Sequence, residues 1–323
     1  MPRKIILDVD TGSDDACAIM LAWLHPEIEL EAVCTVKGNQ PLKYTTENTL
    51  RIRELLKADF PVYRGCAHGL VSDLVYPRIE VTKNADAYDE KGNKLHIHQE
   101  LFDLPEAKGK CEEMPAPLFY ADYLSKAEEP VTVVMVGPLT NLAVALMIKP
   151  EIAEKIEEIV IMGGGHNITN VTLAAEFNIY DDPESALRVL HCGAKITMVP
   201  LDATHTAYIS KKESEELRAI GTDVAKFAAD LIDLRTMVHD QVQPLEVKGS
   251  CALHDPLCIA YLIDPEVLQE VELCNVEISL SGLTYGQTVV DRRYMQEKER
   301  NVHFAFRGDH ERFAKIFVDA FRI

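Results

Sequence analysis

Four aspartates lie close together near the N-terminus, in the segment Asp8-Val9-Asp10-Thr11-Gly12-Ser13-Asp14-Asp15. Ionised carboxylates that are this close repel one another, so each is stabilised by a bound cation or by a hydrogen-bonding ligand. Folding alone requires no such cluster at a turn. Because oxygen ligands suit hard cations, the segment predicts a site for Ca²⁺ or Mg²⁺.

The acidic segment is flanked by two apolar segments with different periodicity. Ile5-Ile6-Leu7 precedes it as a continuous apolar run, which is typical of a buried strand. Apolar residues at helical spacing follow it, from Ala16 to Leu24. The order predicts a strand, a tight turn and a helix, with the carboxylates gathered at the turn.

Strand-like and helix-like segments alternate through the first 200 residues. We expect further strands at 30–36, 61–63, 131–136, 159–162 and 195–199, and helices at 41–57 and 139–148. Beyond these, the pattern favours strands at 276–280 and 302–306 and a closing helix at 309–321. Continuous Val/Ile runs that alternate with helices predict an α/β fold with an open, doubly wound, mostly parallel (Rossmann-like) sheet that carries helical and loop insertions.

The chain shows no Pro/Gly/Ser-rich linker, so we expect one domain over residues 1–323. Two segments break the alternation of strands and helices. Residues 64–114 are polar and predict a mobile loop or insertion, because long loops in compact domains are usually functional. Residues 204–250 predict a helical insertion, with one helix from Lys211 and another from Thr222.

Composition excludes several classes of function. The chain has 33 basic and 52 acidic residues and a net charge of -19, which disfavours a nucleic acid polymer as a partner. No apolar run approaches the ~20 residues of a membrane span, so no membrane partner is expected. The eight cysteines form no Cys-x-x-Cys pair and are expected to be buried thiols. A strand at the N-terminus leaves no room for a signal peptide, which predicts a cytoplasmic protein.

Polar residues follow five of the predicted strands. Ligands of open α/β sheets bind beyond the carboxyl ends of the strands, so we expect these residues to converge on one cleft. They are the acidic turn, Lys37-Gly38-Asn39, Gly137 to Asn141, Gly163 to His166, and Asp202 with Thr204.

Two further segments combine polar and apolar residues. Glu176 and Asn178 lie in the apolar stretch Ala174-Ala175-Glu176-Phe177-Asn178, just before a helix that starts near Pro183. His254-Asp255-Pro256 opens another apolar helix, where Asp255 is either an N-cap followed by proline or a metal ligand.

The acidic turn resembles the N-terminal signature of the nucleoside hydrolases of the inosine–uridine-preferring type. Four further elements occur in the order typical of that family and extend the resemblance from residue 5 to about 260. They are Gly38-Asn39, Val136 to Asn141, Asn170 through Asn178, and His254-Asp255-Pro256.

The resemblance implies a Ca²⁺-dependent enzyme that hydrolyses the N-glycosidic bond of ribonucleosides and releases ribose and free base. It implies Ca²⁺ ligands at Asp10, Asp15, Asp255 and the backbone carbonyl of Val136, with Asp10 also acting as the base toward the attacking water. The implied ribose ligands are Asp14, Asn39, Asn170, Glu176 and Asn178, and the implied catalytic group at the leaving base is His254. The family habit implies a homodimer or homotetramer and a small-molecule nucleoside substrate.

These residue types suit the chemistry. Cleavage of an N-glycosidic bond develops positive charge on the sugar, as in other glycoside hydrolyses, and nearby carboxylates stabilise that charge. Ca²⁺ is a weaker acid than Zn²⁺, so a carboxylate base is needed beside it.

The base-binding half departs from the family. The loop Leu95 to Pro105 lacks the glycines that many members carry. If the loop is aligned with the family on Asp103-Leu104-Pro105, His96 is the catalytic residue at the leaving base. The spacing of residues alone leaves His98 open as a substrate contact. Around 235–243, where members often place tyrosines, this chain has Arg235, His239 and Gln241, and His239 is a candidate substrate contact. The preferred base therefore stays open.

Two other functions compete with this interpretation. Asp8-x-Asp10 after a strand resembles the nucleophile motif of haloacid-dehalogenase-type Mg²⁺ phosphohydrolases, but no suitable later acidic pair accompanies it. A non-catalytic protein that binds ribosyl groups or nucleosides is the other alternative.

Overall fold

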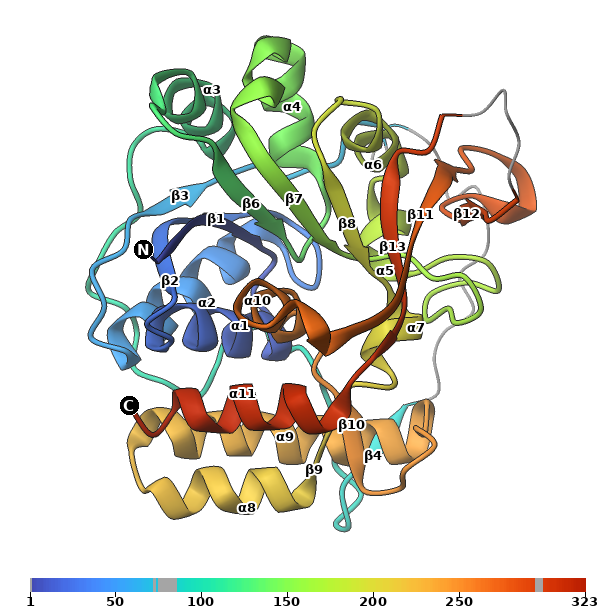
Figure 1. Cartoon of the computed structure of the whole chain (residues 1–323). Helices are drawn as coiled ribbons and strands as arrows, with labels where there is room; N and C mark the ends of the chain where they lie inside the picture. The colour runs from blue at the N-terminus through green and yellow to red at the C-terminus, as the bar shows by residue number, and fades with distance from the viewer. Residues whose placement is uncertain (1, 72–73, 75–85, 294–298) are drawn as a thin grey trace.

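The computed structural model describes residues 2–71, 74, 86–293 and 299–323 and contains a nine-stranded sheet between layers of helices (Figure 1). The strand order is β12-β11-β13-β8-β7-β6-β1-β2-β3. Neighbours from β13 to β3 run parallel, whereas β11 is antiparallel to β13 and β12. The predicted doubly wound, mostly parallel sheet is confirmed. The strands are β1 (Arg3–Val9), β2 (Ile28–Thr35), β3 (Val62–Arg64), β6 (Val131–Met135), β7 (Ile156–Met162), β8 (Ile196–Val199), β11 (Leu268–Ile278), β12 (Thr288–Asp291) and β13 (Val302–Gly308).

Helices cover both faces of the sheet (Figure 1). Alternate side chains of β1 enter different cores, because the pleat directs Ile5 and Leu7 to one face and Ile6 to the other. The first core includes α1 (Ser13–Leu24), α2 (Leu42–Leu55), α10 (Pro256–Ile263) and α11 (His310–Ala320). The second includes α3 (Ala116–Lys126), α4 (Thr140–Ile148), α5 (Phe177–Asp181) and α6 (Pro183–Leu190). Short 3₁₀ turns occupy Pro150–Lys155, Pro265–Val267 and Gly282–Thr284.

The strand order reverses between β1 and β6. From β1 the chain continues outward to β2 and β3 on one side, and then returns to β6, β7 and β8 on the other. Backbone hydrogen bonds hold the ends of these strands together, from Val136 N–H to Asp8 O and from Val36 N–H to Val9 O, both at 2.9 Å. A reversal of this kind leaves a crevice beyond the carboxyl ends, which is the usual ligand site of such sheets.

The predicted helical insertion contains α8 (Lys211–Ile220) and α9 (Asp223–Val242), which begin within one residue of the predicted starts. Ser210 and Glu213 form a capping box at the start of α8, and the Thr222 side chain accepts the Ala225 N–H at the start of α9. The sequence did not reveal a two-stranded antiparallel pair that closes this segment. This part of the chain comprises α7 (Leu201–Thr204), β9 (Tyr208–Ser210) and β10 (Ser250–Ala252) in addition to α8 and α9.

The segment 64–114 is only partly described, because residues 72–73 and 75–85 lie outside the described ranges. Its described part contains a hairpin of β4 (Ala87–Tyr88) and β5 (Lys94–Leu95). The Gln241 side chain of α9 binds both backbone groups of Tyr88, at 3.0 and 2.9 Å. The hairpin is thus attached to α9, while the expected mobility of the loop stays a prediction.

All eight cysteines are free thiols, and five of them are buried. The prediction of buried thiols therefore holds for five cysteines, whereas Cys66, Cys111 and Cys192 are only partly buried. Among the described residues, no helix is long and apolar enough to cross a membrane.

Candidate active site

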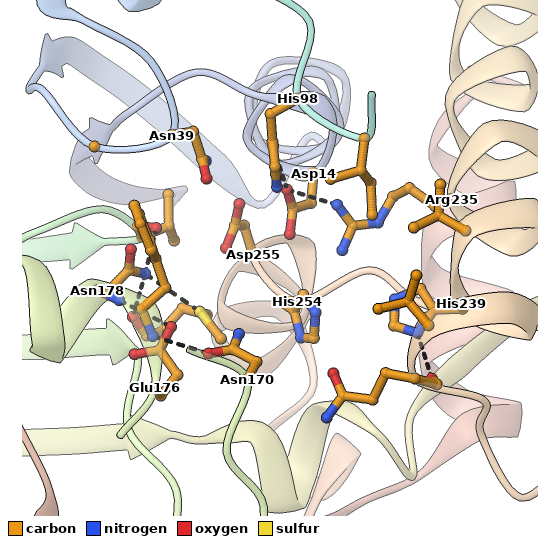
Figure 2. A pocket seen from close by; sticks show the side chains of 18 residues that line it. Asp14, Asn39, His98, Asn170, Glu176, Asn178, Arg235, His239, His254 and Asp255 are labelled. Atoms are coloured by element: carbon orange, nitrogen blue, oxygen red, sulfur yellow. Dashed lines mark hydrogen bonds and ion pairs between the residues drawn. The ribbon is translucent and has the colours of Figure 1, made fainter. Parts of the chain in front are cut away.

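A cavity of about 340 Å³ lies beyond the carboxyl ends of β1 and β6 (Figure 2). Figure 2 shows Asn170, Glu176 and Asn178 on one side and Arg235 and His239 on the opposite side, with Asp14, Asp255 and His254 between them. Of the site residues predicted from the sequence, those that line the cavity are Asp14, Asn39, His98, Val136, Asn170, Glu176, Asn178, His239, His254 and Asp255. Asp10, Asp15 and His96 do not line it.

The acidic turn is organised around Asp15. Its carboxylate accepts the backbone N–H groups of Asp10 and Gly12 at 3.0 and 2.9 Å. Asn39 donates to Asp15 through its side chain at 3.3 Å and to Asp10 Oδ2 through its backbone at 2.5 Å. The turn after β1 and the turn after β2 are therefore fastened together through carboxylates.

Two glycines make room for Asp10. A Cβ at Gly38 would lie 2.0 Å from Asp10 Oδ2, and a Cβ at Gly137 would lie 3.0 Å from Asp10 Oδ1. Asp10 Oδ1 is buried and accepts no hydrogen bond from the described residues. One oxygen of Asp10 is thus fixed, and the other is available to a ligand.

Burial and mutual repulsion act on the whole carboxylate cluster. Burial and then the charge of Asp14 raise the pKa of Asp15 to about 6. Burial raises the pKa of Asp10 and Asp255 well above the ordinary range, with neighbouring carboxylates adding to the shift. A cation at this place would reverse these shifts, because it favours the ionised form of every carboxylate.

The group of carboxylates that lie close enough together to hold a metal ion differs from the predicted set of metal ligands. Oxygens of Asp14, Asp15 and Asp255 lie within 4.8 Å of one another, and all three residues are buried. The family resemblance had implied Asp10, and not Asp14, as a metal ligand beside Asp15 and Asp255. Asp10 is nevertheless close enough for its charge to raise the pKa of Asp255.

Asp255 occupies the N-cap position of α10, and Pro256 is the first helical residue, as the capping interpretation expected. Its carboxylate makes no capping hydrogen bond, and its backbone is already helical at φ -71° and ψ -41°. The side chain faces the cavity instead. Asp255 is therefore available as a ligand.

Asp8 lies outside the cavity. It is fully buried, and its carboxylate accepts hydrogen bonds from Tyr120 Oη at 3.0 Å and from Asn141 Nδ2 at 3.1 and 3.2 Å. Burial raises the pKa of Asp8 to about 7. The haloacid-dehalogenase alternative is wrong, because it requires Asp8 to be an accessible, ionised nucleophile.

The segment after β7 holds Glu176 and Asn178 rigidly. The Glu176 carboxylate caps α5 by accepting the N–H groups of Asn178 and Ile179 at 3.0 and 3.2 Å, and it also accepts Gly164 N–H at 2.9 Å. Burial raises the pKa of Glu176 to about 7 against the effect of these bonds. Asn178 donates through Nδ2 to the carbonyls of Val136 and Met162 at 2.9 and 3.1 Å, and Asn170 Oδ1 accepts Phe177 N–H at 3.0 Å.

Histidines gather at the opposite end. The rings of His205, His239 and His254 lie with centroids 5.8 to 6.2 Å apart. Burial lowers the pKa of His205 to about 4 and that of His239 to about 3, and it lowers the pKa of His254 well below the ordinary value. These imidazoles are therefore neutral at pH 7. The sequence analysis missed His205, which lies one residue after α7 with no motif around it.

Hydrogen bonds restrict two of these rings. His239 Nδ1 lies 3.1 Å from the carbonyl oxygen of Gln243, which can only accept, so the neutral ring carries its proton on Nδ1. His254 Nδ1 lies 2.8 Å from Thr204 Oγ1. In both rings Nε2 is left for the cavity.

The loop histidines separate clearly. His98 lines the cavity, its Nδ1 lies 4.0 Å from Asp14 Oδ1, and burial lowers its pKa to about 4. His96 is exposed and does not line the cavity. The alignment on Asp103-Leu104-Pro105 therefore selected the histidine that does not line the cavity, whereas the spacing along the loop had left His98 open.

One face of α9 completes the cavity. Arg235 and His239 lie four residues apart on α9, Gln243 follows directly after the end of the helix, and all three line the cavity. The sequence analysis named Gln241 in this region, but Gln241 binds the β4–β5 hairpin instead. The four-residue spacing was the signal that would have selected Gln243.

Comparison with known proteins assigns the chain to a family. The sequence pattern of the family described as "Inosine-uridine preferring nucleoside hydrolase" matches residues 5–315. The inosine-uridine preferring nucleoside hydrolase of Leishmania major is 37% identical over 328 residues, which cover 99% of this chain and 98% of the relative. The pyrimidine-specific ribonucleoside hydrolase RihA of Shewanella baltica is 39% identical over 327 residues, which cover 100% and 97%.

The solved structures agree with the sequences. The purine-preferring ribonucleoside hydrolase from Gardnerella vaginalis matches with a TM-score of 0.84 and 30% identity, over 99% of this chain and 98% of that chain. The names of these three relatives state three different base preferences, so similarity alone selects no base for this chain. The chain belongs to the inosine-uridine preferring nucleoside hydrolase family and is an enzyme that acts on ribonucleosides.

Proposed function

We propose that the protein hydrolyses the N-glycosidic bond of ribonucleosides in a Ca²⁺-dependent reaction that releases ribose and free base. The observation that carries this proposal is a single cavity with buried carboxylates in its centre, amide and carboxylate groups on one side and neutral histidines on the other. A ribosyl group and a base require these two different environments.

The carboxylate cluster fits a hard cation. Asp10, Asp15 and Asp255 have raised pKa values, and Asp10 Oδ1 is buried without a hydrogen bond from the described residues. We propose that these three carboxylates and the backbone carbonyl of Val136 hold the cation, because oxygen donors of this kind suit Ca²⁺. When bound, Ca²⁺ would acidify and orient the attacking water.

Asp10 is the proposed general base. Its Oδ2 is fixed by the Asn39 N–H, whereas Oδ1 accepts no hydrogen bond from the described residues and can take a proton from water. Burial raises its pKa, and a nearby cation lowers it, so the loaded site brings the carboxylate toward the range in which a base works at neutral pH.

The proposed ribose ligands are Asp14, Asn39, Asn170, Glu176 and Asn178. Asn178 donates both Nδ2 hydrogens to backbone carbonyls, so its Oδ1 is available to accept a hydrogen bond from a sugar hydroxyl. Asp14 and Glu176 place carboxylate oxygens near the sugar, where positive charge develops in the transition state. These groups therefore both bind the diol and stabilise the charged sugar.

The proposed leaving-group residues are His254 and His98, with His98 in place of the predicted His96, and His239 is a proposed substrate contact that can only accept through Nε2. The three histidines line one part of the cavity together with apolar side chains of α9. Thr204 at 2.8 Å from Nδ1 orients the His254 ring, so that Nε2 can exchange a proton with the departing base.

The decisive test compares two carboxylates in the same chain. Inosine, uridine and p-nitrophenyl riboside are incubated with the protein in Ca²⁺ or in EDTA, and released reducing sugar is measured. We expect Ca²⁺-dependent release that Asp255→Asn abolishes and Asp8→Asn retains. Binding of ribose without release from any of the ribosides would establish the non-catalytic alternative instead.

The remaining proposals concern assembly and boundaries. We propose a homodimer or homotetramer built from a single 1–323 domain, with 204–250 as a helical insertion. Light scattering coupled to size-exclusion chromatography tests the assembly, and a monomer at micromolar concentration would contradict it.

A further inference from the structure

Arg235 is among the largest fully buried side chains of the protein and is only 1% exposed. A guanidinium remains charged at all relevant pH values, so its burial is stable only with partners that satisfy its charge and its hydrogens. Arg235 lies on α9, on the same face as His239, and reaches across the cavity to the acidic turn.

The partners of Arg235 come from two segments of the site. Nη1 donates to Ser13 Oγ at 2.8 Å and lies 2.9 Å from Asp14 Oδ1. Nε donates to the carbonyl of Ala252 at 3.0 Å, two residues before His254. The guanidinium therefore connects the first turn of α1 to the segment that carries Asp255.

The contact with Asp14 is an ion pair and not an aligned hydrogen bond. Asp14 Oδ1 accepts no hydrogen bond from the described residues, although Nη1 lies 2.9 Å away. Arg235 thus balances the charge of Asp14 and leaves its lone pairs available. An acceptor in that condition suits a sugar hydroxyl.

Asp14 is also a potential ligand of the cation. Its carboxylate lies within 4.8 Å of ligand atoms on Asp15 and Asp255, and these three residues could together hold a metal ion. Without a cationic partner, Asp14 would be as well placed as its neighbours to bind the ion. The ion pair with Arg235 offsets the negative charge of Asp14, which makes this carboxylate a weaker ligand for a cation than Asp15 or Asp255.

We propose that Arg235 is a positioning residue. Its ion pair with Asp14 keeps this carboxylate available to the ribose and prevents it from coordinating the cation. The inference rests on the proposed function. It makes α9, which belongs to the inserted segment, a determinant of sugar recognition as well as of the base end.

The first test measures Ca²⁺ binding by calorimetry, which requires no turnover. Arg235→Gln removes a positive charge beside the cation site and releases a carboxylate, so we expect Ca²⁺ to bind about tenfold more tightly. Arg235→Lys keeps the charge and should stay within about twofold of the wild type. Arg218→Gln is the matched control. Arg218 lies on α8 and also forms ion pairs with carboxylates of α9, Asp230 and Asp233, but it is exposed.

The second test compares uridine with 2′-deoxyuridine. If Arg235 positions Asp14 for a ribose hydroxyl, Arg235→Gln should reduce the ribose preference in kcat/KM about tenfold or more, and Asp14→Asn should do the same. The double variant should be no worse than Asp14→Asn alone, because residues that act through each other give non-additive effects. Arg235→Lys should restore part of the preference.

If the role of Arg235 were purely structural, the two tests should give different results. Weaker Ca²⁺ binding in Arg235→Gln, or equal losses on both sugars with additive effects of the two variants, would overturn the proposal. If Arg235→Gln does not fold, Arg235→Lys is measured instead. A simultaneous fall of the ribose preference and of the Ca²⁺ affinity in Arg235→Lys would also overturn the proposal. Failure of the proposed function is distinguishable, because the wild type itself would then release no sugar.

Discussion

The two ends of the cavity are built by different parts of the chain. The carboxylate cluster and the proposed ribose contacts come from the turns after β1 and β2, from the segment that joins β7 to α5, and from the segment between β10 and α10. The proposed base end is formed by α9 and by the loop that carries His98, which lie outside the sheet. Under the proposed function, the chemistry common to all nucleosides would depend on residues close to the sheet, and recognition of the base would depend on α9 and this loop.

If this division holds, a change at the sheet end should affect every substrate equally. Asp10→Ala should lower the rate about 1000-fold or more on inosine, uridine and p-nitrophenyl riboside alike, because it removes the proposed general base. Initial rates of sugar release measure the effect. A loss restricted to one of these substrates would show that the two ends are not independent.

Changes at the base end should depend on the leaving group. His98→Ala should lower the rate about 100-fold on natural nucleosides but only a few-fold on p-nitrophenyl riboside, whose leaving group needs little protonation. His96→Ala is the matched control on the same loop and should leave both rates unchanged. Equal losses on both substrates would exclude His98 from the leaving-group role.

The carboxylates of the cluster should also make the free energy of unfolding depend on pH and on Ca²⁺. The folded pKa of Asp15 is raised to about 6, so in EDTA its contribution is fully present below about pH 4 and is lost as the pH rises through 6. Saturating Ca²⁺ at 100 times its dissociation constant should restore about 2.7 kcal/mol to the free energy of unfolding at pH 7. Urea titrations with Ca²⁺ and with EDTA measure the difference, and identical curves would refute a cation site at these residues.

The smallest effect on activity is expected at Asp8, which belongs to the sheet end but not to the cavity. Asp8→Asn should leave kcat within about threefold, while the free energy of unfolding changes by about 1 kcal/mol because one hydrogen bond to the buried carboxylate is altered. Because burial raises the folded pKa to about 7, the stability that Asp8 contributes is lost as the pH rises toward that value, and the variant should lack this dependence. Chemical denaturation at pH 5 and pH 8 measures it.

The same division explains what could be predicted from the sequence. The apolar runs of β1, β6 and β7 indicated buried parallel strands. Of the polar residues expected to converge beyond the strand ends, Asp14, Gly38 and Asn39 line the cavity, whereas Lys37, Asn141 and Asp202 bind other residues and do not line it. Strand register fixes only the first residues beyond a strand. Glu176, Asn178 and Asp255 also line the cavity, but they lie in other connections and were selected by the motifs of the family resemblance.

The base end could not be predicted equally well, because it depends on how a helix and a loop dock. His205 and Gln243 carry no motif, and the loop offered two histidines separated by one residue. Arg235 was noticed as a departure from the family, but its ion pair with Asp14 joins positions more than 200 residues apart, which no local pattern reveals.

The face of α9 that lines the cavity limits how this enzyme can evolve. Arg235 and His239 face the cavity together because four residues separate them on the helix. At 3.6 residues per turn, one residue inserted or deleted between them would turn the helix beyond that point by about 100° and remove His239 from the cavity. If α9 recognises the base as proposed, new base preferences would arise along it by exchange of side chains at constant length.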